Sequence, residues 1–99
     1  MIYVVASIVL KPGMRSEFVA KANEQIVPQT NAEEGCVFYD LNESSSDPNL
    51  AVFVERWETR EALAAHLTSE HMTAWRPVSG PMIESRTVEI IHPERVETL

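Results

Sequence analysis

The first segment of the chain has the pattern of a β-strand. Residues 2–11 are rich in β-branched and other apolar side chains, and they are followed by the turn sequence Pro12-Gly13. Both faces of an extended chain here would be apolar, because Ser7 is the single polar residue among positions 2–10. We therefore predict a strand that is covered on both sides.

The next segment has helical periodicity. Apolar residues recur every four positions from Met14 to Ile26, with charged residues between them. Pro28 should kink or stop this helix near Val27, because proline lacks a backbone donor and clashes with the preceding turn. We predict one amphipathic helix that ends there.

Two β-prone runs then follow, at residues 36–42 and 50–57, separated by the polar, proline-containing residues 43–49. They predict an antiparallel hairpin. Thr59 and Ser69 are suitable N-caps for two short helices, and the segment from Pro77 to Pro81 should end the helical region. A last strand over 82–91 and a polar tail over 92–99 complete the chain.

The resulting order β-α-β-β-α-β predicts an α+β, ferredoxin-like domain in which both helices cover one face of a four-stranded antiparallel sheet. One domain accounts for residues 1–99, with a core over about 2–91. Since the first strand is apolar on both sides and helices cover only one, we expect the other face to pack against a second subunit in a homodimer.

The amino-acid composition argues against some classes of binding partner. Fifteen acidic residues against eight basic ones give a net charge of −7 without a basic cluster, which argues against binding nucleic acid. No basic leader and no run of roughly 18 apolar residues is present, so we expect a soluble cytoplasmic protein without a membrane partner. Cys36 is the single cysteine and is expected to pack as a small hydrophobic residue.

His66 and His71 are the residues we predict to be catalytic, because imidazole exchanges protons near neutral pH. On an unbroken helix they would diverge by about 140°, so their convergence requires a helix break at Thr68-Ser69. Capping or hydrogen bonding at helix ends is the alternative for both. A zinc site is a weaker interpretation, since the spacing is not i, i+4 and no third ligand is evident, and we expect no metal.

Aromatic residues could form a pocket for a flat substrate. Trp57 and Trp75 are candidate walls, with Tyr39 and Met72 beside them, whereas Phe38 and Phe53 are better explained as core. Glu55 shares a strand face with Trp57, so it must be paired or protonated if that face is buried. It could orient a histidine or, more simply, pair with an arginine.

Four segments resemble the antibiotic biosynthesis monooxygenase family: residues 5–13, residues 26–36 with Glu33-Glu34-Gly35-Cys36, residues 54–59 with Glu-x-Trp, and residues 65–72 with His-Leu-x-x-x-His. The likeness runs from about residue 2 to about residue 91. It implies a dimeric α/β-barrel with one pocket per subunit between sheet and helices. The proline-broken helix and the His-Leu-Thr-x-x-His-Met stretch look most like the quinol monooxygenase branch.

A related branch of this family degrades heme, and the present chain departs from its pattern. At the approximately corresponding positions it has Ser7, His66 and Arg76, so heme degradation is disfavoured. The isomerase branch must hold a phosphate, for which Arg56, Arg60 and Arg76 are the available basic residues.

Three functions remain open. The first is a cofactor-independent monooxygenase that converts a small aromatic hydroquinone or polyphenol to a quinone, since the sequence has no glycine-rich nucleotide loop and the substrate itself could supply the electrons. The second is an isomerase or proton-transfer enzyme that uses the same histidines and needs no oxygen. The third is a non-catalytic, stress-associated dimer that binds a small ligand.

Overall fold

A computed structural model describes all residues, 1–99, and confirms the predicted α+β fold. The sheet contains β1 (Ile2–Leu10), β2 (Cys36–Glu43), β3 (Leu50–Trp57) and β4 (Ile83–Ile91). The helices, together with the short 3-10 helix η1, occupy the two connections from β1 to β2 and from β3 to β4. They are α1 (Arg15–Gln25), α2 (Val27–Asn31), α3 (Arg60–Leu67), α4 (Glu70–Ser79) and η1 (Gly80–Met82).

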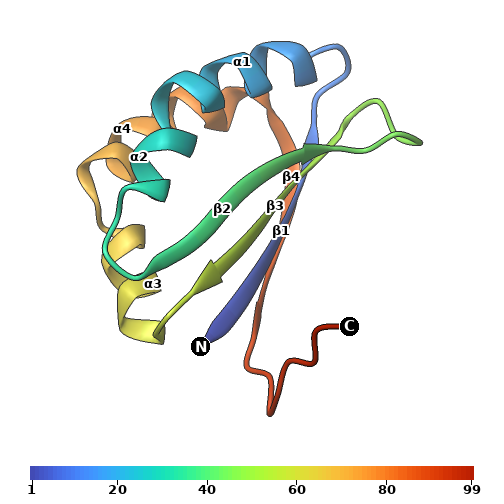
Figure 1. The fold of residues 1–99 in the computed structure, drawn as a ribbon. Coiled ribbons are helices and arrows are strands. Elements are labelled where there is room, and N and C mark those ends of the chain that lie inside the picture. The colour runs from blue at the N-terminus through green and yellow to red at the C-terminus, as the bar shows by residue number, and fades with distance from the viewer.

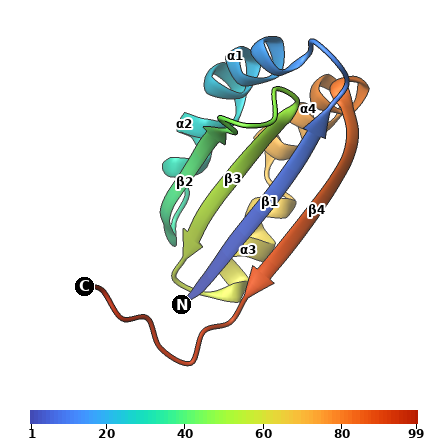
Figure 2. The same ribbon diagram turned by 90° about the vertical axis from the view of Figure 1, so that its right-hand side faces the viewer.

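The strands form one antiparallel sheet in the order β2-β3-β1-β4. All helices lie on one face of this sheet, and the other face carries no element of the chain (Figure 1, Figure 2). This arrangement is the ferredoxin-like split βαβ fold. The buried core lies between the sheet and the helices.

Alternation along β1 sorts its side chains between the two faces. Ile2, Val4, Ala6, Ile8 and Leu10 are buried under the helices, whereas the residues between them are only half-buried on the uncovered face. The central strand β3 alternates in the same way. The pattern that predicted two apolar faces is therefore correct, and one of those faces is left open within a single subunit.

The helix that was predicted to kink or stop near Val27 is interrupted there, and the helical region ends within the predicted segment from Pro77 to Pro81 or one residue after it. The break is at Ile26, whose φ and ψ are −131° and −40°, and the chain then continues as the short helix α2 with Pro28 in its first turn. A proline is tolerated in a first turn because its missing N–H needs no helical partner there. Pro77 lies within α4, which continues to Ser79, because only the last turn loses a backbone bond.

The two predicted N-caps are confirmed. The Thr59 hydroxyl accepts from the Ala62 amide of α3 at 3.1 Å, and the Ser69 hydroxyl accepts from the Met72 amide of α4 at 3.4 Å. Each satisfies a backbone donor that has no partner within its helix. These caps fix where α3 and α4 begin.

Thr30 of α2 is a buried polar residue, and substitution can test the energetic cost of its hydroxyl. Its side chain is fully buried, and its hydroxyl has no hydrogen-bond partner. Thr30→Val is therefore expected to raise the free energy of unfolding by about 1 kcal/mol, because an unsatisfied buried hydroxyl is replaced by a methyl group of similar size. The same exchange at the cap, Thr59→Val, should lower it by about 1 kcal/mol. Urea unfolding of both variants measures the two signs, and destabilisation by Thr30→Val would contradict this placement of its hydroxyl.

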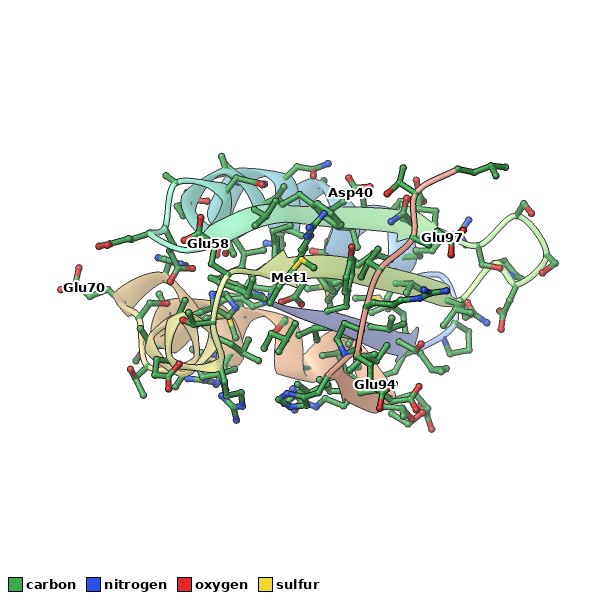
Figure 3. All side chains as sticks on the ribbon, turned by 60° about the horizontal axis from the view of Figure 1, so that its bottom comes forward. Met1, Asp40, Glu58, Glu70, Glu94 and Glu97 are labelled. Carbon is green, nitrogen blue, oxygen red and sulfur yellow. The ribbon has the colours of Figure 1, made fainter.

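The acidic excess lies on the outside of the molecule. The exposed side chains of Asp40, Glu58, Glu70, Glu94 and Glu97 surround the sheet and helices in Figure 3. None of the helices combines the length and the apolar character that a membrane span requires. The charged surface thus leaves the covered face of the sheet as the place to look for a binding site.

Candidate functional site

A cavity opens between the covered face of the sheet and helices α3 and α4. It encloses about 730 Å³ when the open solvent at its mouth is included. Most of its lining is apolar. The lining residues are Val4, Ala6, Ile8, Phe18, Tyr39, Phe53, Glu55, Leu63, His66, Leu67, Met72, Trp75, Arg76, Ser79, Ile83, Arg86, Val88 and Ile90.

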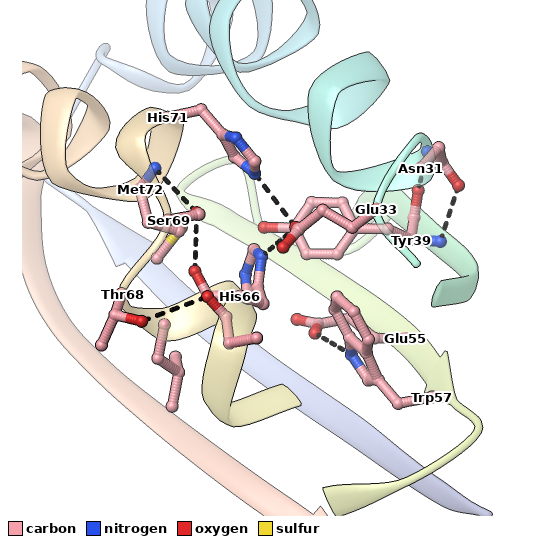
Figure 4. A network of polar contacts seen from close by, with 12 residues as sticks. Asn31, Glu33, Tyr39, Glu55, Trp57, His66, Thr68, Ser69, His71 and Met72 are labelled. Carbon is pink, nitrogen blue, oxygen red and sulfur yellow. Dashed lines mark hydrogen bonds and ion pairs between the residues drawn. The ribbon is translucent and has the colours of Figure 1, made fainter. Parts of the chain in front are cut away.

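His66 in the cavity wall belongs to a cluster of two histidines and a glutamate. Oε2 of Glu33 lies 2.6 Å from Nδ1 of His66 and 3.0 Å from Nε2 of His71 (Figure 4). The His66 side chain is buried, and those of Glu33 and His71 are 16% and 20% exposed. A single carboxylate oxygen therefore connects a buried imidazole to one that reaches solvent.

The two histidines converge because the helical region is interrupted. α3 ends at Leu67 and α4 begins at Glu70, so His66 and His71 belong to different helices and their rings lie 6.0 Å apart. The Ser69 hydroxyl strengthens this corner by donating to the His66 carbonyl at 2.7 Å. The break predicted at Thr68-Ser69 is thus present.

Glu33 is held in place by its neighbours in the connection from α2 to β2. The Asn31 amide bonds both backbone groups of Tyr39, donating to its carbonyl at 2.8 Å and accepting from its N–H at 3.0 Å. Gly35 adopts φ +83° and lies against Ala62 of α3. Both contacts fix the short loop that carries Glu33 over the histidines.

The hydrogen bonds determine where the protons of this cluster lie. A carboxylate oxygen can only accept, so His66 must donate from Nδ1 and His71 from Nε2. Neutral His66 then has an unprotonated Nε2, which has no hydrogen-bond partner within the protein. Because His66 lines the cavity, this nitrogen is available to accept a proton from a bound molecule.

Burial lowers the pKa of His66 below its ordinary value of 6.5. The hydrogen bond and charge of Glu33 oppose this effect, and His71 and the positive charge of Arg76 add to it. His66 is consequently neutral at pH 7, the form in which its Nε2 acts as a base.

Glu55 is the second ionisable group on the cavity wall. It is 5% exposed, and its Oε1 accepts from the indole Nε1 of Trp57 at 2.9 Å. The sequence interpretation placed a histidine or arginine beside Glu55, but the partner is this indole, since both residues point to the same face of β3. Burial raises the pKa of Glu55 from 4.5 to about 7, against the lowering effect of the Trp57 hydrogen bond, and the charge of Glu33 raises it further.

Glu55 should make the stability of the protein depend on pH. Because its pKa is higher in the folded chain, the stabilising effect of its protonated form is fully present below about pH 4.5 and is lost as the pH rises to about 7. The difference corresponds to about 3 kcal/mol. Glu55→Gln keeps an acceptor for Trp57 and stays neutral, so we expect it to be more stable than the wild type by about 2–3 kcal/mol at pH 8.

Urea unfolding at pH 5 and pH 8 measures this effect. The advantage of Glu55→Gln should shrink at pH 5, where the wild-type carboxyl is largely protonated. An equal difference at both pH values would show that Glu55 ionises freely in the folded protein.

Tyr39 and Cys36 stay protonated at neutral pH. Burial raises the pKa of Tyr39 well above its usual value, with Glu55 and Glu33 adding to the effect. Burial likewise raises the pKa of the Cys36 thiol to about 11, with contributions from the same two carboxylates. Cys36 is partly buried against the core and, as a thiol, is a poor nucleophile.

Five of the seven predicted site residues line the cavity, and the other two lie beside it. Tyr39, Glu55, His66, Met72 and Trp75 line the cavity. His71 touches the site through Glu33, and Trp57 is fully buried outside the lining, where its indole bonds Glu55 and its ring lies 5.0 Å from that of His66.

Sequence reasoning missed Glu33 as a site residue. It was part of the family-like Glu33-Glu34-Gly35-Cys36 stretch, but nothing in the spacing connects it with histidines more than thirty residues away. Arg76 was weighed only for heme and phosphate, and Arg86 was not considered. Glu33, Arg76 and Arg86 are brought to the site by contacts between elements far apart in the sequence, and no local pattern reports such contacts.

Glu33 also supplies the third potential metal ligand that the sequence did not reveal. Two atoms bound to one tetrahedral zinc at about 2.0–2.1 Å would lie about 3.3 Å apart. The nitrogen–oxygen separations of 2.6 and 3.0 Å are instead those of hydrogen bonds. The three side chains therefore form a hydrogen-bonded network, and binding a metal would require their nitrogen and oxygen atoms to move apart.

Named proteins of other organisms are similar to this chain over nearly its whole length. YcnE of Bacillus subtilis, which is named as a monooxygenase, is 31% identical over 98% of this chain and all of its own. A protein of Escherichia coli named "Probable quinol monooxygenase YgiN" is 32% identical over 94% of this chain and 98% of its own.

Solved structures agree with the sequence relatives. The structure of Rv0793 from Mycobacterium tuberculosis superposes with a TM-score of 0.86 at 30% identity, covering 98% of both chains. The family model described as antibiotic biosynthesis monooxygenase matches residues 1–78, which include every strand and helix up to most of α4. The protein therefore belongs to the antibiotic biosynthesis monooxygenase family.

Proposed function

We propose that this protein is a cofactor-independent monooxygenase that oxidises a small aromatic hydroquinone in the cavity between its sheet and helices. The observation that carries the proposal is that His66, whose Nδ1 is held by Glu33 and whose Nε2 has no partner in the protein, lines an apolar cavity. A base in this position can take the proton of a phenolic hydroxyl.

The cavity supports a flat aromatic substrate. Trp75, Phe18, Phe53 and Tyr39 contribute aromatic surface, and the aliphatic side chains of β1 complete the floor. The polar groups are few, which is the composition expected of a pocket that orients a largely apolar ligand. Water is excluded from such a surface, so charges that develop there are screened less than in solution.

In the proposed reaction His66 accepts the hydroxyl proton as the hydroquinone reacts with molecular oxygen. The developing phenolate gives up electrons more readily than the phenol, so proton transfer promotes electron transfer to oxygen. One oxygen atom then enters the ring and the other leaves as water, so that hydroquinone and one O2 yield a hydroxyquinone and one water. The substrate supplies all the electrons for this balance.

Glu33 and His71 are positioning residues in this scheme. Glu33 fixes the tautomer of His66 and stabilises the imidazolium that forms when its Nε2 is protonated. His71, with 20% of its side chain exposed, donates to the same oxygen and limits its movement. Neither residue needs to touch the substrate.

Oxygen consumption with a panel of substituted hydroquinones tests the proposal. The protein should accelerate oxygen uptake in the presence of a chelator, and ¹⁸O₂ should deliver one labelled atom to each quinone product. Turnover that continues without oxygen would establish an isomerase or another proton-transfer reaction instead. Tight binding of the panel without any conversion would favour a binding protein.

We further propose that the uncovered face of the sheet pairs with that of a second subunit. Tyr3, Val5 and Val9 of β1 and Val52 and Val54 of β3 present an apolar surface there without a covering helix. Sedimentation equilibrium should give a mass of twice the 11.2 kDa subunit. Val54→Lys should shift the protein toward monomers, and a wild-type protein that stays monomeric at all concentrations would overturn this proposal.

A further inference from the structure

Two arginines stand out against the apolar lining of the cavity. Arg76 of α4 and Arg86 of β4 both contribute to its wall, and both are exposed. Neither forms an ion pair with any carboxylate of the protein, although the chain has fifteen acidic residues and only eight basic ones. Two of the scarce cations are thus located at the cavity and left unpaired.

The other arginines with side-chain contacts are engaged elsewhere. Arg15 pairs with Glu43, and Arg95 pairs with Glu97. Arg56 lies over the ring of Tyr3, with its guanidinium carbon 5.4 Å from the ring centroid. Arg56 and Arg60 also lack an ion pair with a carboxylate, so what distinguishes Arg76 and Arg86 is that both line the cavity.

Arg76 reaches toward the reactive end of the cavity. Its Nη2 donates to the carbonyl of Leu67, the residue that follows His66 and itself lines the cavity. One N–H is used in this way, and the remaining donors of the guanidinium have no protein acceptor. Its charge is close enough to His66 to lower the pKa of that imidazole.

Arg86 approaches from the sheet. It lies opposite Ile8 of β1 in the strand register, on the covered face and beside the exposed cavity residue Val88. Arg76 and Arg86 thus contribute to the cavity lining from two layers of the molecule, the helices and the edge strand. A planar guanidinium from either layer presents paired donors suited to a carboxylate.

We propose that the substrate is a hydroquinone that carries a carboxylate on its ring, with Arg76 and Arg86 binding the carboxylate at the mouth of the cavity and His66 facing a hydroxyl. This inference rests on the proposed function for the hydroquinone part. The claim that the substrate carries a carboxylate rests on the two arginines without an ion-pair partner, and measurements of binding alone test it.

The test compares 2,5-dihydroxybenzoate with 2,5-dihydroxybenzamide by isothermal titration calorimetry without oxygen. The two molecules have nearly the same shape and hydroxyl groups and differ in the charge of one substituent. Wild-type protein should bind the benzoate at least about tenfold more tightly, with an advantage that shrinks as salt is added. Arg76→Gln and Arg86→Gln should each reduce the advantage, and the double variant should abolish it.

Arg60→Gln is the matched control, because it removes an exposed arginine that does not line the cavity. It should leave the preference for the benzoate unchanged. Equal binding of benzoate and benzamide, or the same loss in Arg60→Gln as in the cavity variants, would overturn the inference. Because no oxygen is present, either result is independent of whether the protein is a monooxygenase.

Discussion

Replacing His66 with glutamine is expected to lower kcat for hydroquinone oxidation by about 10²–10⁴-fold, the usual effect of losing a general base. Glutamine can still bond Glu33, but it cannot accept a proton from the substrate. The measurement is oxygen uptake at saturating substrate, with circular dichroism to show that the variant is folded. Binding of the substrate should change little, so the loss should appear in kcat and not in KM.

The three histidines of the chain form a matched series for this test. His71→Gln removes a residue that holds Glu33 but does not line the cavity, and we expect a loss of less than about tenfold. His92→Gln changes an exposed residue beyond β4 and should have no effect. Full activity in His66→Gln, or losses of equal size at positions 66 and 71, would contradict the assignment of His66 as the base.

Replacing Gly35 with alanine is expected to lower the free energy of unfolding by about 2–5 kcal/mol. A Cβ at this position would lie 2.6 Å from the Cβ of Ala62, and the backbone has φ +83°. Strain in the left-handed region contributes about 1–2 kcal/mol and overpacking about 1–3 kcal/mol. Chemical denaturation measures the sum, and kcat should fall as well because Glu33 lies two residues away.

Two further variants separate the contributions. Gly13→Ala introduces the same side chain at φ +78° with nothing within 4 Å, so it should show only the backbone strain. Ala62→Gly removes the atom that Gly35→Ala would meet, and the double variant should recover the overpacking part relative to the sum of the single changes. Equal destabilisation by Gly13→Ala and Gly35→Ala would show that the loop moves freely away from α3.

The strands and caps were predictable because their determinants are local. The alternation of β1 and the hydroxyls of Thr59 and Ser69 act within a few residues, and the structure places them as expected. The break near Pro28 and the end of the helical region after Pro77 were also predicted, but the exact residues were not, because a proline ends a helix only where its missing N–H would have been bonded or its ring would clash. The first turn of α2 and the last turns of α4 tolerate it.

The site was only partly accessible to sequence reasoning. A helix break was predicted as the condition for His66 and His71 to converge, but the carboxylate that joins them comes from the α2–β2 loop, which no local pattern connects to α3. Trp57 was expected to form a wall of a pocket for a flat aromatic substrate. Its indole instead turns to Glu55 beneath the site, because on the covered face of β3 the nearest acceptor is two residues away.

The pH dependence of kcat/KM in the wild type and in Glu33→Gln tests the central claim most directly, namely that His66, oriented by Glu33, is the base of the site. Activity of the wild type should fall as the pH drops through the pKa of His66, which lies below 6.5. Glu33 raises that pKa, so Glu33→Gln should move this acid limb to lower pH while reducing the plateau. The limb should remain in Glu55→Gln, which excludes the carboxyl of pKa about 7 as its source. A limb at the same pH with and without Glu33, or one that disappears in Glu55→Gln, would contradict the account.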